Sequence, residues 1–403
     1  MPEAADQVPK NERLSPVVWR LGWVSFFTDV ATEMIYPLLP AFLATMGAAG
    51  RWLGIVEGVA ESVGALVKWR TGVVSDKAPV RKPYVVAGYT LSSLARPLTA
   101  LAIAPWQVVF VRATDRVGKG LRSAPRDALL AIVASPERRA AAFAVHQMMD
   151  NLGAVVGPLV AFTLASALGW SIPHIFAWTI VPGILAVATL IFGVKEPAAS
   201  QTPTPPPAGV AAPPSERLPG RVRGYLVAVA VFSLGASADS FLMLRLSRLG
   251  LAVAYLPIAW LSLNAVKATL NVPGGRIADR IGHKPTLLGG WVLYAAVYAM
   301  LPFAHTVEAT WILMLLYGGY YGLSEGAEKA LLAEMVTRKQ RGRAFGAFHA
   351  ITGIAVLPAN AVFGFLFDLH PRMAFWFGAG AAALGALLLA PVRSKPEAAR
   401  GRD

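Results

Sequence analysis

Apolar stretches long enough to cross a membrane recur about twelve times along the chain. They cover approximately residues 17–46, 52–75, 84–104, 106–134, 142–168, 173–194, 224–249, 253–278, 286–304, 308–335, 344–369 and 372–392. Each has the roughly 20 residues that a helix needs to cross the hydrocarbon core. Barrel strands would alternate in polarity and be about half as long, and the backbone must satisfy its own polar groups in hydrocarbon. The pattern predicts an all-α membrane protein with twelve transmembrane helices.

One polar segment divides the twelve expected spans into two groups of six. The segment 195–223 is rich in Pro and Ala and has no apolar periodicity, which is typical of a flexible or extended linker. The expected organisation is an N-terminal tail (1–16), a six-helix bundle (17–194), the Pro-rich linker (195–223), a second six-helix bundle (224–392) and a C-terminal tail (393–403).

Three motifs of the first half return in the second half in the same order. "GVVSDKAPVRKP" (72–83) is similar to "GRIADRIGHKP" (275–285), "GLRSAPRDALLA" (120–131) to "GLSEGAEKALLA" (322–333), and "GAVVGP" (153–158) to "GIAVLP" (353–358). The separation stays close to 200 residues in all three pairs. A shared offset of this kind indicates a duplicated unit, and therefore two pseudo-symmetric six-helix bundles.

Composition supports a membrane protein and excludes several kinds of site. The chain is 55% hydrophobic and 15% charged, with a mean hydropathy of +0.52, whereas soluble domains carry about 25% charged residues. Cysteine is absent, so there is no disulfide framework, thiolate metal site or cysteine nucleophile. The polar N-terminal stretch lacks the features of a signal peptide, so we expect the first span to remain in the mature protein.

Lys and Arg are distributed unevenly between alternate connecting segments. With the N terminus in the cytoplasm, twenty-one of them fall on the cytoplasmic side and only Arg51 and Arg372 on the other. The positive-inside rule then predicts a multi-pass protein of the cell inner (cytoplasmic) membrane with both termini cytoplasmic. Topology and anionic lipid account for most of the net charge of +14, and nucleic acid is not an expected partner.

The repeated motif between helices 2 and 3, and again between helices 8 and 9, resembles the signature of the major facilitator superfamily of secondary transporters. Its matching positions are Gly72, Asp76, Lys77 and Arg81 in the first copy, and Gly275, Asp279, Arg280, Gly282 and Lys284 in the second. The first copy departs from the family pattern at Pro79, where Gly is usual. The resemblance extends over essentially the full length. It implies two halves that rock about a central site, with the signature residues acting at the gate.

The motif "GAVVGP" in helix 5, with Gly153, Gly157 and Pro158, resembles the antiporter-associated signature of the same family. Gly at a four-residue spacing is also common in packed membrane helices, so a packing role is an equal alternative. Leu357 replaces the second Gly in the other repeat, which argues against a symmetric function.

A charged face runs along the fourth expected helix, in "VFVRATDRVGKGLRSAPRDALLA" (109–131). Its members are Arg112, Asp115, Arg116, Lys119, Arg122 and Arg126, which fall on one side at 100° per residue. A charge at the bilayer centre costs about 3 kcal/mol even on a lenient scale, so this face cannot contact lipid. Ala113 and Gly120 stand where a nucleotide phosphate loop requires Gly and Ser or Thr, which excludes that motif. Gly118 and Gly120 indicate either close helix contacts or a loosened helix.

Three interpretations of the charged face remain open and can coexist. The cations could pair with carboxylates of helices 1, 2 and 5, especially Arg122 and Arg126 near the cytoplasmic gate. Arg116 and Lys119 could recognise an anionic or chelated substrate. Arg112 could set the proton affinity of a neighbouring carboxylate in a relay.

The intramembrane polar residues and the family resemblance together define the candidate site. Expected substrate contacts are Arg112, Arg116, Lys119, Tyr36, Asp150, Asn151, Asp239, Arg245, Asn264 and Lys267. Expected proton- or cation-coupling groups are Asp29, Glu33, Glu57, Glu61 and Asp115. Expected gating residues are Gly72, Asp76, Lys77, Arg81, Arg122, Arg126, Gly153, Gly157, Pro158, Gly275, Asp279, Arg280, Lys284, Glu325 and Glu328.

The function predicted from these features is secondary active transport by alternating access. We expect proton-coupled antiport, in the efflux direction, of an anionic or metal-chelate solute or a drug-like compound, by a monomer in contact with lipid. Proton-coupled anion uptake or exchange is the alternative within transport. A membrane-embedded enzyme or a non-transporting sensor is the alternative outside it, although no nucleophile or metal motif supports an enzyme. No cofactor or bound metal is expected.

Overall fold

The computed structural model describes residues 14–48, 50–75, 80–135, 138–196, 218–337 and 340–393, and these ranges contain helices and turns without strands. The first six rods are α1 (Pro16–Ile35) continued by η1 (Tyr36–Leu38) and α2 (Leu39–Thr45), α3 (Gly50–Ser75), α4 (Lys82–Leu98) with η2 (Thr99–Leu101), α5 (Pro105–Val133), α6 (Arg139–Ser166), and α7 (Ile172–Trp178) with α8 (Ile180–Ala188) and η4 (Thr189–Gly193). The other six are α9 (Gly220–Gly235) with α10 (Ser240–Arg248), η6 (Val253–Tyr255) with α11 (Leu256–Ile281), α12 (His283–Met300) with η7 (Leu301–Phe303), α13 (Val307–Glu334), α14 (Arg341–Leu369) and α15 (Pro371–Leu389). The predicted all-α architecture with twelve membrane-length rods is confirmed.

Helix boundaries follow local chemistry. Pro16 stands in the first turn of α1, and the Ser15 hydroxyl accepts a hydrogen bond from the Val17 amide (3.3 Å). The Gln107 side chain of α5 reaches back to the amides of Ile103 (2.7 Å) and Ala104 (3.1 Å). Gly282 separates α11 from α12 with φ of +96°, a conformation that only glycine adopts without strain. Its counterpart in the first repeat, Pro79, lies outside the described residues.

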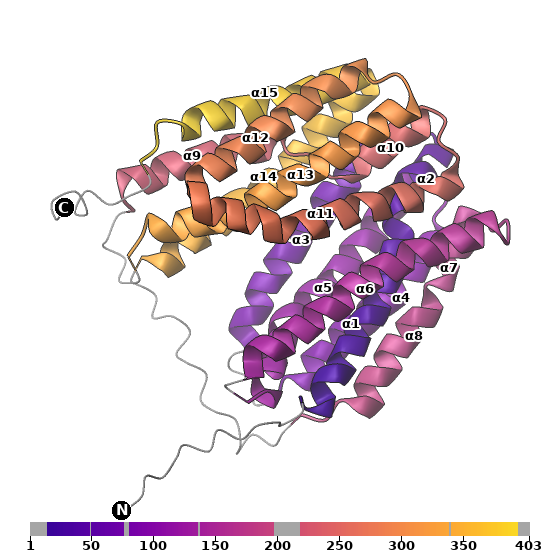
Figure 1. Ribbon diagram of the computed structural model, residues 1–403. Helices are drawn as coiled ribbons and strands as arrows, with labels where there is room; N and C mark the ends of the chain where they lie inside the picture. The colour runs from indigo at the N-terminus through magenta and orange to yellow at the C-terminus, as the bar shows by residue number, and fades with distance from the viewer. Residues whose placement is uncertain are drawn as a thin grey trace, which may run out of the picture.

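The rods form two bundles with the same internal arrangement, indigo to magenta and salmon to yellow in Figure 1. In the first bundle α1 packs on α6, and α3 packs on α5. In the second, α9 packs on α14, and α11 packs on α13. Rods at matching places in the two halves thus have matching neighbours, which confirms the two pseudo-symmetric bundles expected from the repeated motifs.

The bundles meet at the end of the molecule where α2 leads into α3, which we call the far end. The Asp368 carboxylate of α14 accepts hydrogen bonds from the Gly50 (2.8 Å) and Arg51 (2.7 Å) amides at the start of α3, and Arg248 lies 3.4 Å from the same carboxylate. An anionic group at a helix N terminus is favourable. One turn on, Gly54 lies against the backbone of Asn360 with no room for a side chain. The far end is therefore closed by backbone-level contacts between the bundles.

The opposite end, where α1 begins at Pro16 and α15 ends at Leu389, we call the termini end. There Lys68 of α3 and His349 of α14, which are electrostatic neighbours across the two bundles, are both exposed. The interface between the bundles thus opens towards the termini end.

Seven rods within the described ranges combine sufficient length with an apolar window holding at most two charged residues. They start with α6, α7, α9, η6, α12, α14 and α15. The rods built on α1, α3, α4, α5 and α13 are not among them. Four of these five belong to the first bundle, which therefore concentrates the charged side chains.

Candidate functional site

Glycine contacts insert α5 between α3 and α4. A Cβ atom at Gly118 would lie 2.6 Å from the Gly88 carbonyl oxygen, and one at Gly120 would lie 2.8 Å from the Val67 side chain. Real Cβ atoms do not approach so closely, so glycine is required for this packing. Of the two expected roles for Gly118 and Gly120, the close helix contact is confirmed. The insertion brings the charged face of α5 against side chains of both neighbouring helices.

Asp115 is the centre of a buried ion network. Its carboxylate lies 3.0 Å from Arg96 Nε of α4 and 3.8 Å from Arg112 Nη1, and Arg112 Nη2 lies 3.5 Å from Glu57 Oε1 of α3. All four side chains are at most 3% exposed. Two cations and two carboxylates thus compensate one another, as burial of charge requires.

The second part of the charged face is more accessible. Arg116 pairs with Glu61 at 2.9 Å, and the Glu61 side chain is 51% exposed. Lys119, one turn on, is also exposed. Arg122 instead donates to the Ser92 hydroxyl (2.8 Å) and stacks over the Tyr89 ring at 4.4 Å. In this part of the charged face, Lys119 is itself accessible, and Arg116 of α5 has an accessible partner in Glu61 of α3.

The remaining cation of the charged face, Arg126, pairs with the adjacent residue Asp127. Its guanidinium donates two hydrogen bonds to the Asp127 carboxylate, at 2.9 and 2.7 Å. Asp127 is 45% exposed. Within the part of the chain that the structure describes, Arg112 and Arg116 are the cations of the α5 face that pair with carboxylates of another helix, and both of those carboxylates belong to α3.

Helix α6 packs tightly against the acidic face of α1. A Cβ atom at Gly153 would lie 2.9 Å from the Cβ of Asp29, and one at Gly157 would lie 2.9 Å from the Cβ of Glu33. Pro158 is buried next to this contact. The two glycines therefore fix the positions of the two half-buried carboxylates of α1.

Asp150 and Asn151 lie on the same helix, towards the termini end. His146 Nδ1 is 3.4 Å from Asp150 Oδ2, and Asp150 is an electrostatic neighbour of Asp29. Asn151 is exposed and accepts a hydrogen bond from Gln147 (3.2 Å).

The second bundle carries its central charge at a break in a helix. Residues 236–239 separate α9 from α10, and side chains satisfy the freed backbone: Asn360 accepts from the Ala238 amide (2.8 Å), and the Tyr294 hydroxyl accepts from the Ser237 amide (3.4 Å). The Ser237 side chain is hydrogen-bonded to the Tyr298 hydroxyl (2.9 Å). Irregular backbone at membrane depth needs such partners, and in transporters it marks binding sites.

The break positions Asp239 at the start of α10. Its carboxylate binds the Lys267 ammonium of α11 and accepts hydrogen bonds from the hydroxyls of Tyr317 (2.6 Å) and Tyr321 (3.0 Å) of α13. The Lys267 ammonium also lies 3.9 Å from the centre of the Tyr321 ring. One ion pair in the second bundle is therefore enclosed by phenol groups.

One residue joins the two polar clusters. The Trp260 indole Nε1 of α11 donates to Glu33 Oε2 at 2.5 Å, and its ring centre lies 4.5 Å from that of Tyr36. The Arg112 guanidinium is 5.9 Å from the centre of the Tyr36 ring, and the Lys267 ammonium is 5.4 Å from that of Trp260. A continuous polar and aromatic array thus runs from Asp115 in the first bundle to Asp239 in the second.

Two expected substrate contacts lie apart from the hydrogen bonds of this array. Arg245 donates to the Ala304 carbonyl (2.8 Å) beyond the end of α12, where it holds a loop. Asn264 is half-buried on α11, three residues before Lys267.

The expected gating residues are only partly described. Asp76 and Lys77 lie outside the described residues. A Cβ atom at Gly72 would reach only Ala124, at 3.8 Å, and one at Gly275 would meet nothing within 4 Å. The close helix approach of this region is made instead by Gly274, against Gly322.

The charged residues of the two signatures lie at helix ends. The amides of Arg81 and Lys82 donate to the Glu196 carboxylate at 2.8 Å each, which caps α4. Asp279 and Arg280 are exposed, and Lys284 donates to the Ala390 carbonyl (2.6 Å).

The two expected gating carboxylates of α13 differ in burial. Glu325 is exposed, whereas Glu328 is half-buried and its backbone carbonyl accepts a hydrogen bond from Tyr225 (2.9 Å).

Several members of the array were not predicted from the sequence. They are Arg96, Trp260, Tyr298, Tyr317, Tyr321 and Asn360. Arg96 is the single charge in the stretch 84–104, and an isolated charge within a span marks a functional site by default. Tyr317 and Tyr321 have the four-residue spacing of one helix face. Nothing in the local pattern distinguishes Trp260 from the other tryptophans.

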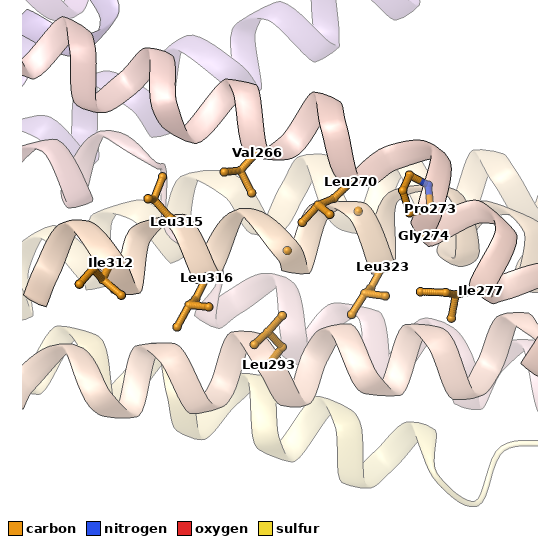
Figure 2. A pocket seen from close by; sticks show the side chains of 12 residues that line it. Val266, Leu270, Pro273, Gly274, Ile277, Leu293, Ile312, Leu315, Leu316 and Leu323 are labelled. Atoms are coloured by element: carbon orange, nitrogen blue, oxygen red, sulfur yellow. The ribbon is translucent and has the colours of Figure 1, made fainter.

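An apolar cavity of about 520 Å³ lies between α11, α12 and α13 of the second bundle. Figure 2 shows its lining, in which Leu270, Leu293 and Leu316 are typical members. No charged side chain lines it, so it supplies no group for ion or proton binding. In the described part of the chain, no cluster of three or more His, Asp and Glu side chains is arranged to hold a metal ion.

Comparison with known proteins gives consistent matches over most of the chain. The family model described as Major Facilitator Superfamily matches residues 21–265 and 249–403. An uncharacterized MFS-type transporter of Methanocaldococcus jannaschii is 30% identical over 389 residues, covering 94% of this chain and 96% of its own. A multidrug resistance protein, MdtH, of Salmonella newport is 24% identical over 357 residues, covering 85% and 84%.

Solved structures share the fold at low sequence identity. The nucleoside transporter NupG superposes with a TM-score of 0.76 at 13% identity, covering 93% of this chain and 98% of its own. A D-xylose–proton symporter superposes with a TM-score of 0.71 at 17% identity, covering 96% and 98%.

Proposed function

Because the chain belongs to the Major Facilitator Superfamily and is a multi-pass membrane transporter, we propose that it exports a small solute by proton-coupled antiport. Asp29 and Glu33 are the groups that exchange protons. The observation that carries the proposal is the placement of these two carboxylates on α1, where Gly153 and Gly157 of α6 fix them and Glu33 accepts a hydrogen bond from Trp260 of the other bundle.

The two-bundle geometry suits alternating access. The present conformation is closed at the far end by Asp368 and open towards the termini end. Rocking of one bundle against the other would break the far-end contacts and expose the same central groups to the other side. A proton and a substrate that bind these groups in turn would then exchange across the membrane.

We assign the substrate to anionic or metal-chelate solutes and drug-like compounds. Lys119 offers an exposed cation, and Arg116 offers a guanidinium whose partner Glu61 is accessible. Tyr36 and Trp260 add an aromatic surface. A relative named as a multidrug resistance protein supports export of such compounds.

We place the protein in the inner membrane with both termini in the cytoplasm. The bias of Lys and Arg towards one set of connecting segments supports this orientation. The termini end is then cytoplasmic, and the conformation described is open to the inside.

Proton-coupled anion uptake is a second candidate, favoured by one contact. Protonation of the half-exposed Glu61 would release Arg116 to bind an anion, so the proton and the anion would bind together. Synergistic binding of this kind drives symport, whereas competition drives antiport.

Reconstitution in liposomes tests the proposal. We would first screen organic anions, metal chelates and cationic drugs for stabilisation of the purified protein. Flux of a stabilising compound should then be driven out of the compartment facing the termini end by an inward proton gradient. Asp29→Asn should abolish the dependence of flux on that gradient, whereas Glu308→Gln, at the exposed start of α13, should leave it intact. Unchanged pH dependence in Asp29→Asn would remove Asp29 from the coupling role, and flux of an anion in the direction of the proton would favour symport.

A further inference from the structure

We propose that Trp260 is a positioning residue that makes the closed contact between the bundles depend on the proton carried by Glu33. This inference rests on the proposed proton coupling and adds to it the structural element that senses the proton. Trp260 belongs to the second bundle and Glu33 to the first, so their bond is a contact between the moving halves.

The geometry gives Trp260 three neighbours of different kinds. Its Nε1 donates to Glu33 (2.5 Å), its ring packs on Tyr36 (4.5 Å between centres), and the Lys267 ammonium lies 5.4 Å from its ring centre. The side chain is 6% exposed. Trp260 therefore connects a carboxylate of the first bundle to the ion pair of Lys267 and Asp239 in the second.

The chemistry of the two groups makes this bond sensitive to charge. An indole N–H can only donate, and an ionised carboxylate can only accept. A hydrogen bond to an ionised acceptor is about twice as strong as one to a neutral acceptor. When Glu33 takes up a proton, one of its oxygens becomes a donor that needs another acceptor, and the bond to Trp260 weakens. Proton binding therefore loosens the contact that holds α11 against α1.

The charged groups around Glu33 come from three helices. Asp29 lies on α1 itself, Arg116 and Lys119 face Glu33 from α5, and Lys267 faces it from α11. The α6 side contributes Gly157, which carries no charge. In the described structure none of these charged groups donates a hydrogen bond to Glu33, whereas the indole of Trp260 does. The bond to the indole is therefore the contact that a proton on Glu33 alters directly.

Loss of the hydrogen bond between Trp260 and Glu33 would also affect the second bundle. Lys267 lies near the face of the Trp260 ring, and its partner Asp239 stands at the break between α9 and α10. Displacement of Trp260 from Glu33 removes one of the two aromatic faces next to the Lys267 ammonium. Loss of the proton-sensitive bond is thus transmitted to the α9–α10 rod, which is already interrupted at residues 236–239.

The test uses the conservative variant Trp260→Phe with a matched control. Phenylalanine keeps an aromatic ring for Tyr36 and Lys267 but has no N–H. Trp311→Phe removes another indole hydrogen bond, to Ser262 (2.9 Å), that lies wholly within the second bundle. Because the natural sequence has no cysteine, spin labels can be introduced at Ala140→Cys of α6 and Ile281→Cys of α11. Both positions are exposed near the termini end of neighbouring helices from different bundles.

The readout is the distance between the two labels as a function of pH, without substrate. In the labelled parent and in Trp311→Phe, the ratio of molecules open at the termini end to molecules closed there should change by roughly tenfold as Glu33 titrates. This is the effect of about one charge-assisted hydrogen bond. In Trp260→Phe and in Glu33→Gln that pH-dependent shift should be lost, and the double variant should add nothing further.

Three results would overturn the inference: a pH-dependent shift that persists in Trp260→Phe, an equal loss in Trp311→Phe, or a parent whose label distances do not respond to pH. Flux measured in parallel separates this from the proposed function. Proton-driven flux in a protein whose distances ignore pH would refute only the role of Trp260. A Trp260-dependent shift in a protein without proton-driven flux would refute only the proposed antiport.

Discussion

The two bundles have the same arrangement of helices but stabilise their charges in different ways. The first bundle buries Arg96, Arg112, Asp115 and Glu57 in a network among three continuous helices. In the second, the central pair, Asp239 with Lys267, lies beside a helix break and next to two tyrosines. Buried ion networks are costly to disturb, so the first bundle is the more rigid support. The second places its pair at a point where the backbone is already free to rearrange.

The largest difference between the bundles should appear when a central carboxylate of the network is neutralised. Asp115→Asn removes the ion-pair partner of the buried Arg96 and leaves Arg112 paired with Glu57. We expect a loss of about 3–5 kcal/mol in the free energy of unfolding, the cost of an uncompensated buried charge. Denaturant unfolding of the purified protein in detergent measures it. Asp127→Asn, whose carboxylate is 45% exposed and paired with the adjacent Arg126, should change it by about 0.5 kcal/mol or less. A loss below about 1 kcal/mol for Asp115→Asn would contradict the compensated network.

The corresponding change in the second bundle should be smaller. Asp239→Asn removes the partner of Lys267, but the Lys267 side chain is 17% exposed and its ammonium keeps its contact with the Tyr321 ring. We expect a loss of about 2–3 kcal/mol, measured in the same unfolding experiment. Adding Lys267→Met should recover more than half of it, because the uncompensated charge is then removed. If Asp239→Asn costs as much as Asp115→Asn, the two bundles do not differ in the way described.

The smallest effect concerns packing at a position where the repeats differ, Gly157 in one and Leu357 in the other. A Cβ at Gly157 would lie 2.7 Å from the Val30 carbonyl oxygen, so Gly157→Ala should destabilise the protein by about 1–2 kcal/mol through overpacking. Gly346→Ala, on α14 with no atom within 4 Å of the added Cβ, should instead be neutral or stabilising by about 0.5–1 kcal/mol.

Leu357 packs across the bundles onto Gly58. Leu357→Ala should therefore increase opening at the far end, measured by label distances, more than it lowers the free energy of unfolding.

Much of the candidate array follows from sequence reasoning that needs no tertiary contact. Asp29 and Glu33, four residues apart, share a helix face, and so do the charges from Arg112 to Lys119. The cost of burying a charge directs both faces away from lipid. The partners on other helices could not be assigned in this way. Glu57 and Glu61 are both carboxylates of α3, and only the depth at which α3 crosses α5 pairs the first with Arg112 and the second with Arg116.

The sequence by itself determined the class of the protein, the number of its spans, the duplication and the face on which the charges lie. These properties depend on the length and period of apolar segments, which every helix carries locally. Only the tertiary structure decided that Trp260 contacts Glu33, that Asp368 closes the far end, and that the α9–α10 rod breaks at Asp239. Those contacts join residues more than a hundred positions apart or depend on partners from several helices. Their free energy belongs to the packed assembly, and no single segment of the chain encodes it.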